Sequence, residues 1–119
     1  MVDDRPFKAY YQTTAREVVE VIGLAEDQWQ HIVDGHGDAI TIEKLEIALT
    51  DPTHVYQGKA KGTSTTAIFV NENVAAEGTS KLVAGYVKLI PGEVGYVSTA
   101  FPKHAAELGK PIWVKGGQK

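Results

Sequence analysis

The chain of 119 residues contains no cysteine. It therefore has neither disulfides nor thiolates, which excludes zinc ribbons, cysteine hydrolases and dithiol redox relays. The fold must be held by packing alone. With 43% hydrophobic residues, the chain is large enough for one ordinary domain with a single core, so we expect one domain over residues 1–119.

Long apolar runs are also missing. No stretch approaches the roughly 20 residues that a membrane-spanning helix needs, and residues 1–5 lack the pattern of a signal peptide. We therefore expect no membrane span. These first residues resemble a cut end, which indicates a module of a longer protein.

Arginine is scarce, since it occurs only at Arg5 and Arg16. The net charge of -3 and the pI of about 5.8 argue against a generic basic nucleic-acid binder. Acidic residues dominate Glu17–Asp51, whereas most lysines follow Gly58. A polyanionic partner would therefore be bound locally, by a positive face in the second half of the chain.

Two helices are expected in the first half. An acidic turn at residues 25–28 precedes Trp29 and Ile32, whose spacing places them on one helix side. Because Gly35 allows the chain to turn, we expect His36 just past the helix end. The apolar spacing within Ala39–Leu49 predicts a second helix, which Asp51 and Pro52 stop.

The N-terminal part has no clean period. We interpret Asp3–Tyr11 as an arm or a short helical segment. Thr13–Leu24 combines a possible helix N-cap with the β-branched run Val18–Ile22, so it fits a helix or a strand. We favour a strand over its second half, ended by Gly23.

The second half carries strand signals, with a favoured turn at Pro91-Gly92. The expected strands, the last at an edge, are Val55–Gln57, Thr65–Val70, Lys81–Ile90, Tyr96–Phe101 and Pro111–Val114. We expect them to pair antiparallel, with a hairpin around Pro91-Gly92. The predicted fold is α+β, with N-terminal helices packed on a four- to five-stranded antiparallel sheet.

Alternation along the predicted hairpin assigns side chains to the two sheet faces. In Lys81–Ile90, Tyr86 and Lys88 share a face. In the partner strand, strict alternation places Ser98 and Thr99 on opposite faces. Helices packed on one face leave the other free to bind.

The sequence offers few catalytic motifs. His31 and His36 are five residues apart, unlike the i, i+4 spacing of zinc ligands on a helix, and His54 and His104 stand alone. We therefore expect no metal and no cofactor. No serine lies in a Gly-x-Ser-x-Gly elbow, and no glycine-rich phosphate loop is present.

General acid–base catalysis on RNA fits the residue types better. Imidazole titrates near neutral pH, and RNA supplies its own nucleophile, the 2′-hydroxyl. The candidate catalytic residues are His31, His36, Lys59, Lys61, Lys81, Ser98 and Thr99, with Lys88 and Lys103 as RNA-binding residues. Each also has a structural interpretation, since such histidines commonly pack and hydrogen-bond, and such lysines are commonly solvated.

Three short motifs carry a resemblance to a known family. They are Trp-x-His-Ile-x-x-x-His at Trp29–His36, Ala-Leu-Thr-Asp-Pro-x-His-Val at Ala48–Val55, and Val-Ser-Thr-Ala-Phe at Val97–Phe101. Over Trp29–Phe101 the chain resembles the barnase, EndoU, colicin and RelE-like (BECR) nuclease superfamily, in its phage and polymorphic-toxin forms, including contact-dependent inhibition toxins. The resemblance implies N-terminal helices before a four-stranded antiparallel sheet.

It also implies a function: metal-independent RNase activity, frequently on tRNA, that proceeds through a 2′,3′-cyclic phosphate. His31 or His36 would be the helix histidine, and Thr99 or Ser98 the strand hydroxyl. Where the family usually has an arginine on its middle strands, the cation would be Lys59, Lys61 or Lys81.

Such a domain is the C-terminal toxin module of a larger secreted or phage protein. It would act in the target-cell cytoplasm in bacterial competition and would need a cognate immunity protein in the producing cell.

Two other classes stay open. The chain could be a non-catalytic protein-interaction domain that uses the sheet edge or the acidic helices. It could also be a metal-dependent hydrolase, which loss of activity on chelation would support.

Overall fold

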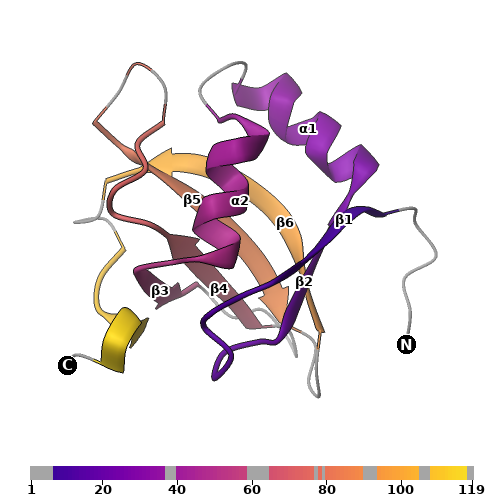
Figure 1. The fold of residues 1–119 in the computed structure, drawn as a ribbon. Helices are drawn as coiled ribbons and strands as arrows, with labels where there is room; N and C mark the ends of the chain where they lie inside the picture. The colour runs from indigo at the N-terminus through magenta and orange to yellow at the C-terminus, as the bar shows by residue number, and fades with distance from the viewer. Residues whose placement is uncertain are drawn as a thin grey trace.

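A computed structural model of the chain describes residues 7–36, 40–58, 65–76, 78, 80–89, 94–104 and 108–117. Within these ranges the chain forms two α-helices and a seven-stranded sheet, so the α+β class is confirmed (Figure 1). The elements are β1 (Phe7–Gln12), β2 (Val21–Ala25), α1 (Glu26–His36), α2 (Ile42–Thr50), β3 (His54–Gln57), β4 (Thr65–Val70), β5 (Leu82–Leu89), β6 (Val94–Lys103), β7 (Pro111–Val114) and the 3-10 turn η3 (Lys115–Gly117). None of the helices formed by the described residues is long and apolar enough to cross a bilayer.

The sheet has the order β1-β2-β6-β5-β4-β3-β7. The expected strands form its β6-β5-β4-β3-β7 part, where every pairing is antiparallel and β7 lies at the edge, as predicted. The hairpin β1–β2 extends this part, and β2 pairs with β6 in parallel. The prediction of a four- to five-stranded, purely antiparallel sheet is therefore wrong in both size and strand direction.

The two N-terminal strands lack the period-2 signal for a physical reason. β2 lies between β1 and β6 and is buried from Ile22 to Ala25, so it is a continuous apolar run. It passes through Gly23, which therefore does not end the strand. β1 pairs only with β2 among the described strands, so the prediction of an arm or short helical segment at Asp3–Tyr11 is wrong from Phe7 onward.

Helix α1 begins with the expected acidic turn but ends later than expected. It continues through Gly35, and His36 is its last residue, so the prediction that His36 lies past the helix end is wrong. A single glycine costs a helix only about 1 kcal/mol relative to alanine. The packing of Ile32 and Trp29 against the core offsets that cost.

Helix α2 begins and ends with side-chain and backbone caps, near the predicted bounds. The Oγ1 of Thr41 accepts a hydrogen bond from the Lys44 N–H at 3.2 Å, which satisfies one free donor of the first turn. At the other end, the Asp51 N–H donates to the Ile47 carbonyl at 2.8 Å, and Pro52 follows.

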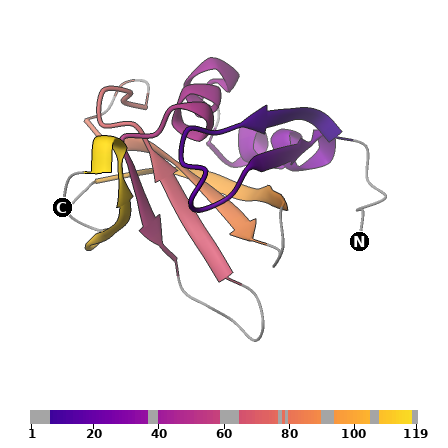
Figure 2. The same ribbon diagram turned by 60° about the horizontal axis from the view of Figure 1, so that its bottom comes forward.

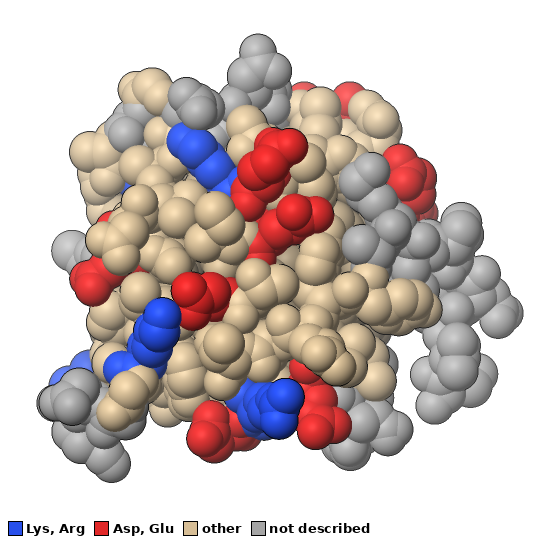
Figure 3. Space-filling view, in the orientation of Figure 1, with Lys and Arg blue, Asp and Glu red and all other residues tan. Residues whose placement is uncertain are grey.

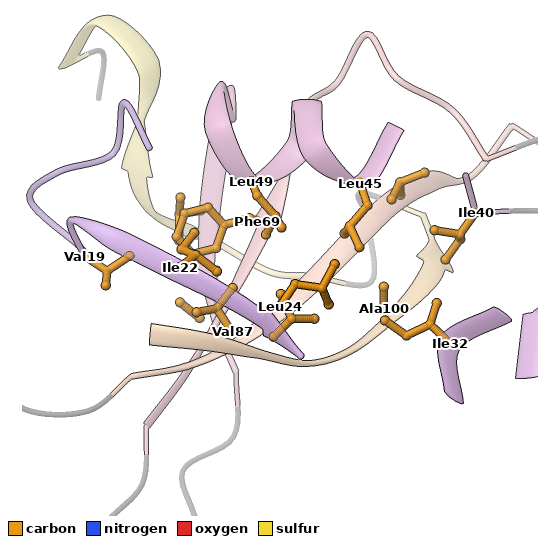
Figure 4. Close-up of a cluster of buried hydrophobic side chains, with 14 of the residues drawn as sticks. Val19, Ile22, Leu24, Ile32, Ile40, Leu45, Leu49, Phe69, Val87 and Ala100 are labelled. Atoms are coloured by element: carbon orange, nitrogen blue, oxygen red, sulfur yellow. The ribbon is translucent and has the colours of Figure 1, made fainter. Parts of the chain in front are cut away.

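Both helices lie on one face of the sheet (Figure 2). Leu45 and Leu49 of α2 point into the core that Ile22 and Phe69 share with them (Figure 4). Gly85 of β5 allows α2 to approach closely, since a Cβ there would lie 3.1 Å from a methyl carbon of each leucine. The opposite sheet face, here named the open face, carries no helix in the described part of the chain.

One partly buried hydrogen bond predicts that the protein loses stability at alkaline pH. The Tyr11 hydroxyl of β1 donates to Oε2 of Glu46 in α2 at 2.9 Å. Burial, aided by this bond and the Glu46 charge, raises the pKa of Tyr11 above its ordinary value of 10.0. The tyrosine of the unfolded chain loses its proton near that value while the folded chain keeps it. The contribution is thus complete below pH 10.0 and is lost as the pH rises through the folded pKa.

We therefore expect Tyr11→Phe to lower the free energy of unfolding by about 1–3 kcal/mol at neutral pH. The variant should also lose less stability above pH 10.0 than the wild type does. Urea unfolding of both proteins at neutral and alkaline pH measures this. Parallel stability losses above pH 10.0 would show that Tyr11 is not the responsible group.

Candidate functional site

The open face contains a groove, named here the open-face groove. Its walls are formed by Gln57, Gly58, Thr66, Ile68, Tyr86, Ser98, Lys103 and Leu108. The cavity volume is about 460 Å³, within the roughly 300–1,000 Å³ of small-molecule sites. Ile68 belongs to a small buried apolar cluster on this face, and the groove residues Tyr86 and Leu108 pack against that cluster. The groove thus combines apolar side chains with polar and cationic ones.

A β-bulge in β6 places two hydroxyls on this face. Tyr86 pairs with Thr99, but the next residue, Val87, pairs with Val97, so Ser98 is an extra residue in β6. Ser98 lines the groove, and Thr99 faces the same way as its partner Tyr86. The prediction that Ser98 and Thr99 lie on opposite faces is therefore wrong, because the bulge interrupts the alternation.

The bulge is also where helix α1 meets β6. The parallel pairing of β2 with β6 covers only Val94–Tyr96, and α1 begins directly after β2 ends. The Gln28 side-chain amide of α1 donates a hydrogen bond to the Ser98 carbonyl. The Oγ of Ser98 donates to the Tyr86 carbonyl at 3.3 Å. Beyond the end of the β2 pairing, helix α1 therefore contacts β6 in place of a strand (Figure 1).

His31 lies on the same side of α1 as Gln28. The two residues are three apart, so they are neighbours on the helix surface, about one turn or 5 Å along the axis. His31 is exposed, while Ile32 beside it is buried in the core. His36 is the last residue of α1, and its side chain lies outside the described residues.

The structure locates three of the five candidate lysines. Lys103 lines the open-face groove, and Lys88 faces the same way because it pairs with Thr66, a groove residue. Lys81 is exposed just before β5, and its carbonyl accepts a hydrogen bond from the Ala76 N–H at 2.8 Å. Lys59 and Lys61 lie outside the described residues.

The fold therefore brings some of the predicted site residues together. Ser98, Thr99, Lys88 and Lys103 share the open face, and His31 lies along the helix that contacts the bulge. Lys81 is not among the groove residues. Within the described ranges, no three His, Asp or Glu side chains gather as metal ligands would.

Sequence reasoning missed Gln28, Gln57, Thr66 and Tyr86. Thr66 and Tyr86 could have been found from strand register, since Thr66 pairs with Lys88 and Tyr86 with Thr99. Gln57 could not, because it pairs with Ala67 of the helix-face core. Gln28 has no sequence signal, because its role depends on where β2 ends beside β6.

The charged side chains over α2 differ from those beside the groove. On the helix face, acidic side chains gather over α2 (Figure 3). Glu43 is exposed and Glu46 half-buried in that helix. A phosphate chain would be repelled there, whereas Lys88 and Lys103 attract it on the open face.

On the open face, burial raises the pKa of the Tyr56 phenol, and the negative charge of Glu72 raises it further. This phenol therefore keeps its proton to a higher pH than an ordinary tyrosine does.

Comparison of the chain with protein-family models, with curated proteins and with solved structures gives no match in any of the three. The site must therefore be interpreted from its own chemistry.

Proposed function

We propose that this chain is a metal-independent ribonuclease that acts at the junction of α1 with the bulge of β6. In this proposal it is the toxin module of a larger secreted or phage protein, with tRNA as a possible substrate. A cell that produces such an enzyme would need a cognate immunity protein to mask it. The resemblance of the Trp29–His36 and Val97–Phe101 motifs to BECR nucleases supports the same assignment.

The observation that carries the proposal is the hydrogen bond from Gln28 to the Ser98 carbonyl. It connects the helix that bears His31 to the strand segment that bears two neighbouring hydroxyls. The same segment lines a groove that contains Lys103. An imidazole, hydroxyl donors and a cation are the groups that a metal-free RNase needs around one phosphate.

In the proposed reaction His31 removes the proton of a ribose 2′-hydroxyl. The 2′-oxygen attacks the adjacent phosphorus, and the bond from phosphorus to the 5′-oxygen breaks. A second acid, for which His36 is the sequence candidate, protonates that leaving oxygen. The products are a 2′,3′-cyclic phosphate and a free 5′-hydroxyl, while Lys103 and the hydroxyl of Thr99 stabilise the extra charge on phosphorus.

The test is incubation of the purified chain with total tRNA in EDTA. We expect cleavage that leaves 2′,3′-cyclic phosphate ends. Intact RNA at high protein concentration, together with normal growth of cells that express the chain, would contradict the proposal.

Gln28 gives a sharper test of the geometry. We expect Gln28→Leu to lower kcat for RNA cleavage by about 10- to 100-fold with little change in KM, because small misplacement of a reacting group is costly. The matched control is Gln30→Ala on the same helix, since Gln30 is exposed and bonds only to Asp34 among the hydrogen bonds of the described residues. Equal kcat values for the two variants would show that the anchor of α1 does not position the reaction.

Protein binding at a sheet edge is the second candidate function. β7 pairs only with β3 among the described strands, and its Ile112 side chain is 52% exposed. An edge strand of this kind can accept an added strand from another chain. Under this function Ile112→Lys abolishes the biological effect and His31→Ala preserves it, the reverse of what a ribonuclease requires.

A further inference from the structure

The walls of the open-face groove match the parts of a single nucleotide. Tyr86 offers an aromatic ring, and Ile68 and Leu108 add apolar surface beside it. The hydroxyl of Thr66, which faces the groove, can both donate and accept hydrogen bonds, as the edge of a base requires. Lys103 supplies a positive charge for a phosphate.

The Tyr86 ring is held in place before any ligand binds. It packs against Phe101 in an edge-to-face arrangement, with ring centroids 5.0 Å apart and an interplanar angle of 89°. The hydrogen bond from Ser98 Oγ to the Tyr86 carbonyl also fixes the backbone. A base that stacks on a ring already fixed loses less entropy on binding.

The dimensions of the groove limit what it admits. Its volume of about 460 Å³ suits one base with its sugar. A paired base cannot enter, because its edge and both faces are occupied in the duplex. Proteins that recognise RNA through aromatic side chains accordingly bind splayed, single-stranded nucleotides.

We propose that the open-face groove binds one unpaired nucleotide, with its base against Tyr86, and that the substrate is therefore single-stranded or looped RNA and not a duplex. The proposal rests on the ribonuclease function proposed above, since Ser98 lines the groove and also forms the bulge. A nucleotide bound there has its sugar and phosphate beside Ser98 and Thr99. The groove thus selects the nucleotide whose phosphate is cleaved.

The experiment measures binding separately from cleavage. A fluorescein-labelled single-stranded DNA has no 2′-hydroxyl, so it binds without reacting, and its anisotropy reports Kd. We expect Tyr86→Leu to weaken binding about tenfold, because base stacking contributes about 1–3 kcal/mol. Tyr86→Phe should bind as the wild type does, and so should Tyr10→Leu at the 61% exposed Tyr10 of β1. The same sequence as a duplex should bind at least about tenfold more weakly than the single strand.

A second variant keeps the test valid if Tyr86→Leu does not fold. Thr66 is half-buried in β4 and valine has nearly the same shape, so Thr66→Val should fold normally and bind about threefold more weakly. The proposal would be overturned by unchanged Kd values for Thr66→Val and for a folded Tyr86→Leu. It would also be overturned by a duplex that binds as tightly as the single strand. If binding depends on Tyr86 but no RNA is cleaved, the nucleotide-binding proposal is supported and the ribonuclease proposal is rejected. If RNA is cleaved and neither substitution alters the cleavage, the ribonuclease proposal is supported and the nucleotide-binding proposal is rejected.

Discussion

Replacement of His31 by alanine is expected to slow RNA cleavage by about 10²–10⁴-fold, the usual contribution of a general acid or base. The side chain is exposed on α1, so the substitution should leave the fold intact. Single-turnover cleavage of tRNA in EDTA measures the effect, and circular dichroism checks the fold.

The matched control for this variant is Gln30→Ala, at the exposed neighbouring position of α1. It should cleave at the wild-type rate. If His31→Ala also cleaves at that rate, the reaction does not use this imidazole, and His36 becomes the next histidine to replace. If the wild type cleaves no RNA but its biological effect survives in His31→Ala, the protein-interaction function is correct.

The second large effect is expected in the core. Leu49 of α2 is fully buried and points toward the sheet (Figure 4). We expect Leu49→Ala to lower the free energy of unfolding by about 2–5 kcal/mol, through lost apolar burial and the cavity left behind. Urea unfolding, extrapolated to water, measures the change.

Gly85 allows the cause of this loss to be identified. A Cβ at Gly85 would lie 3.1 Å from Leu49 Cδ2 and from Leu45 Cδ1, so Gly85→Ala alone crowds the core. When Leu49 is replaced by alanine, the methyl group of Gly85→Ala occupies the space that the leucine side chain has left. We expect the double variant to be more stable than the sum of the single changes by about 0.5–3 kcal/mol.

Gly35→Ala is the control for this cycle, since a Cβ at that position of α1 would meet nothing within 4 Å. Combined with Leu49→Ala, it should be additive. If the unfolding free-energy changes of Gly85→Ala and Leu49→Ala simply add, Leu49 of α2 does not pack against β5 at Gly85.

Local patterns predicted the second half of the chain well. β4 and β7 have the predicted bounds, because β-branched and aromatic runs between turn residues need no distant partner to be recognised. α2 was predicted from apolar spacing and the Asp51-Pro52 stop. β1 and β2 were missed or cut short, because their strand conformation depends on the pairing of β2 between β1 and β6.

The candidate site was predicted only in part. Residue type alone identified His31, Ser98 and Lys103, and the fold places the last two in one groove. Sequence alternation could not locate the bulge, because an inserted residue is defined by its partner strand. The role of Gln28 likewise depends on an edge of β6 that β2 leaves uncovered.

By itself the sequence determined the α+β class and the order of its helices before the main strands, and it supplied the residue types on which the ribonuclease proposal rests. These follow from apolar periodicity and side-chain chemistry, which are local. Only the tertiary structure decided that the sheet has seven strands with one parallel pairing, that Ser98 and Thr99 share a face, and that α1 is anchored at the bulge. Those features depend on contacts between segments as far apart as Gln28 and Ser98, which are 70 positions apart in the chain and carry no local signal of their contact.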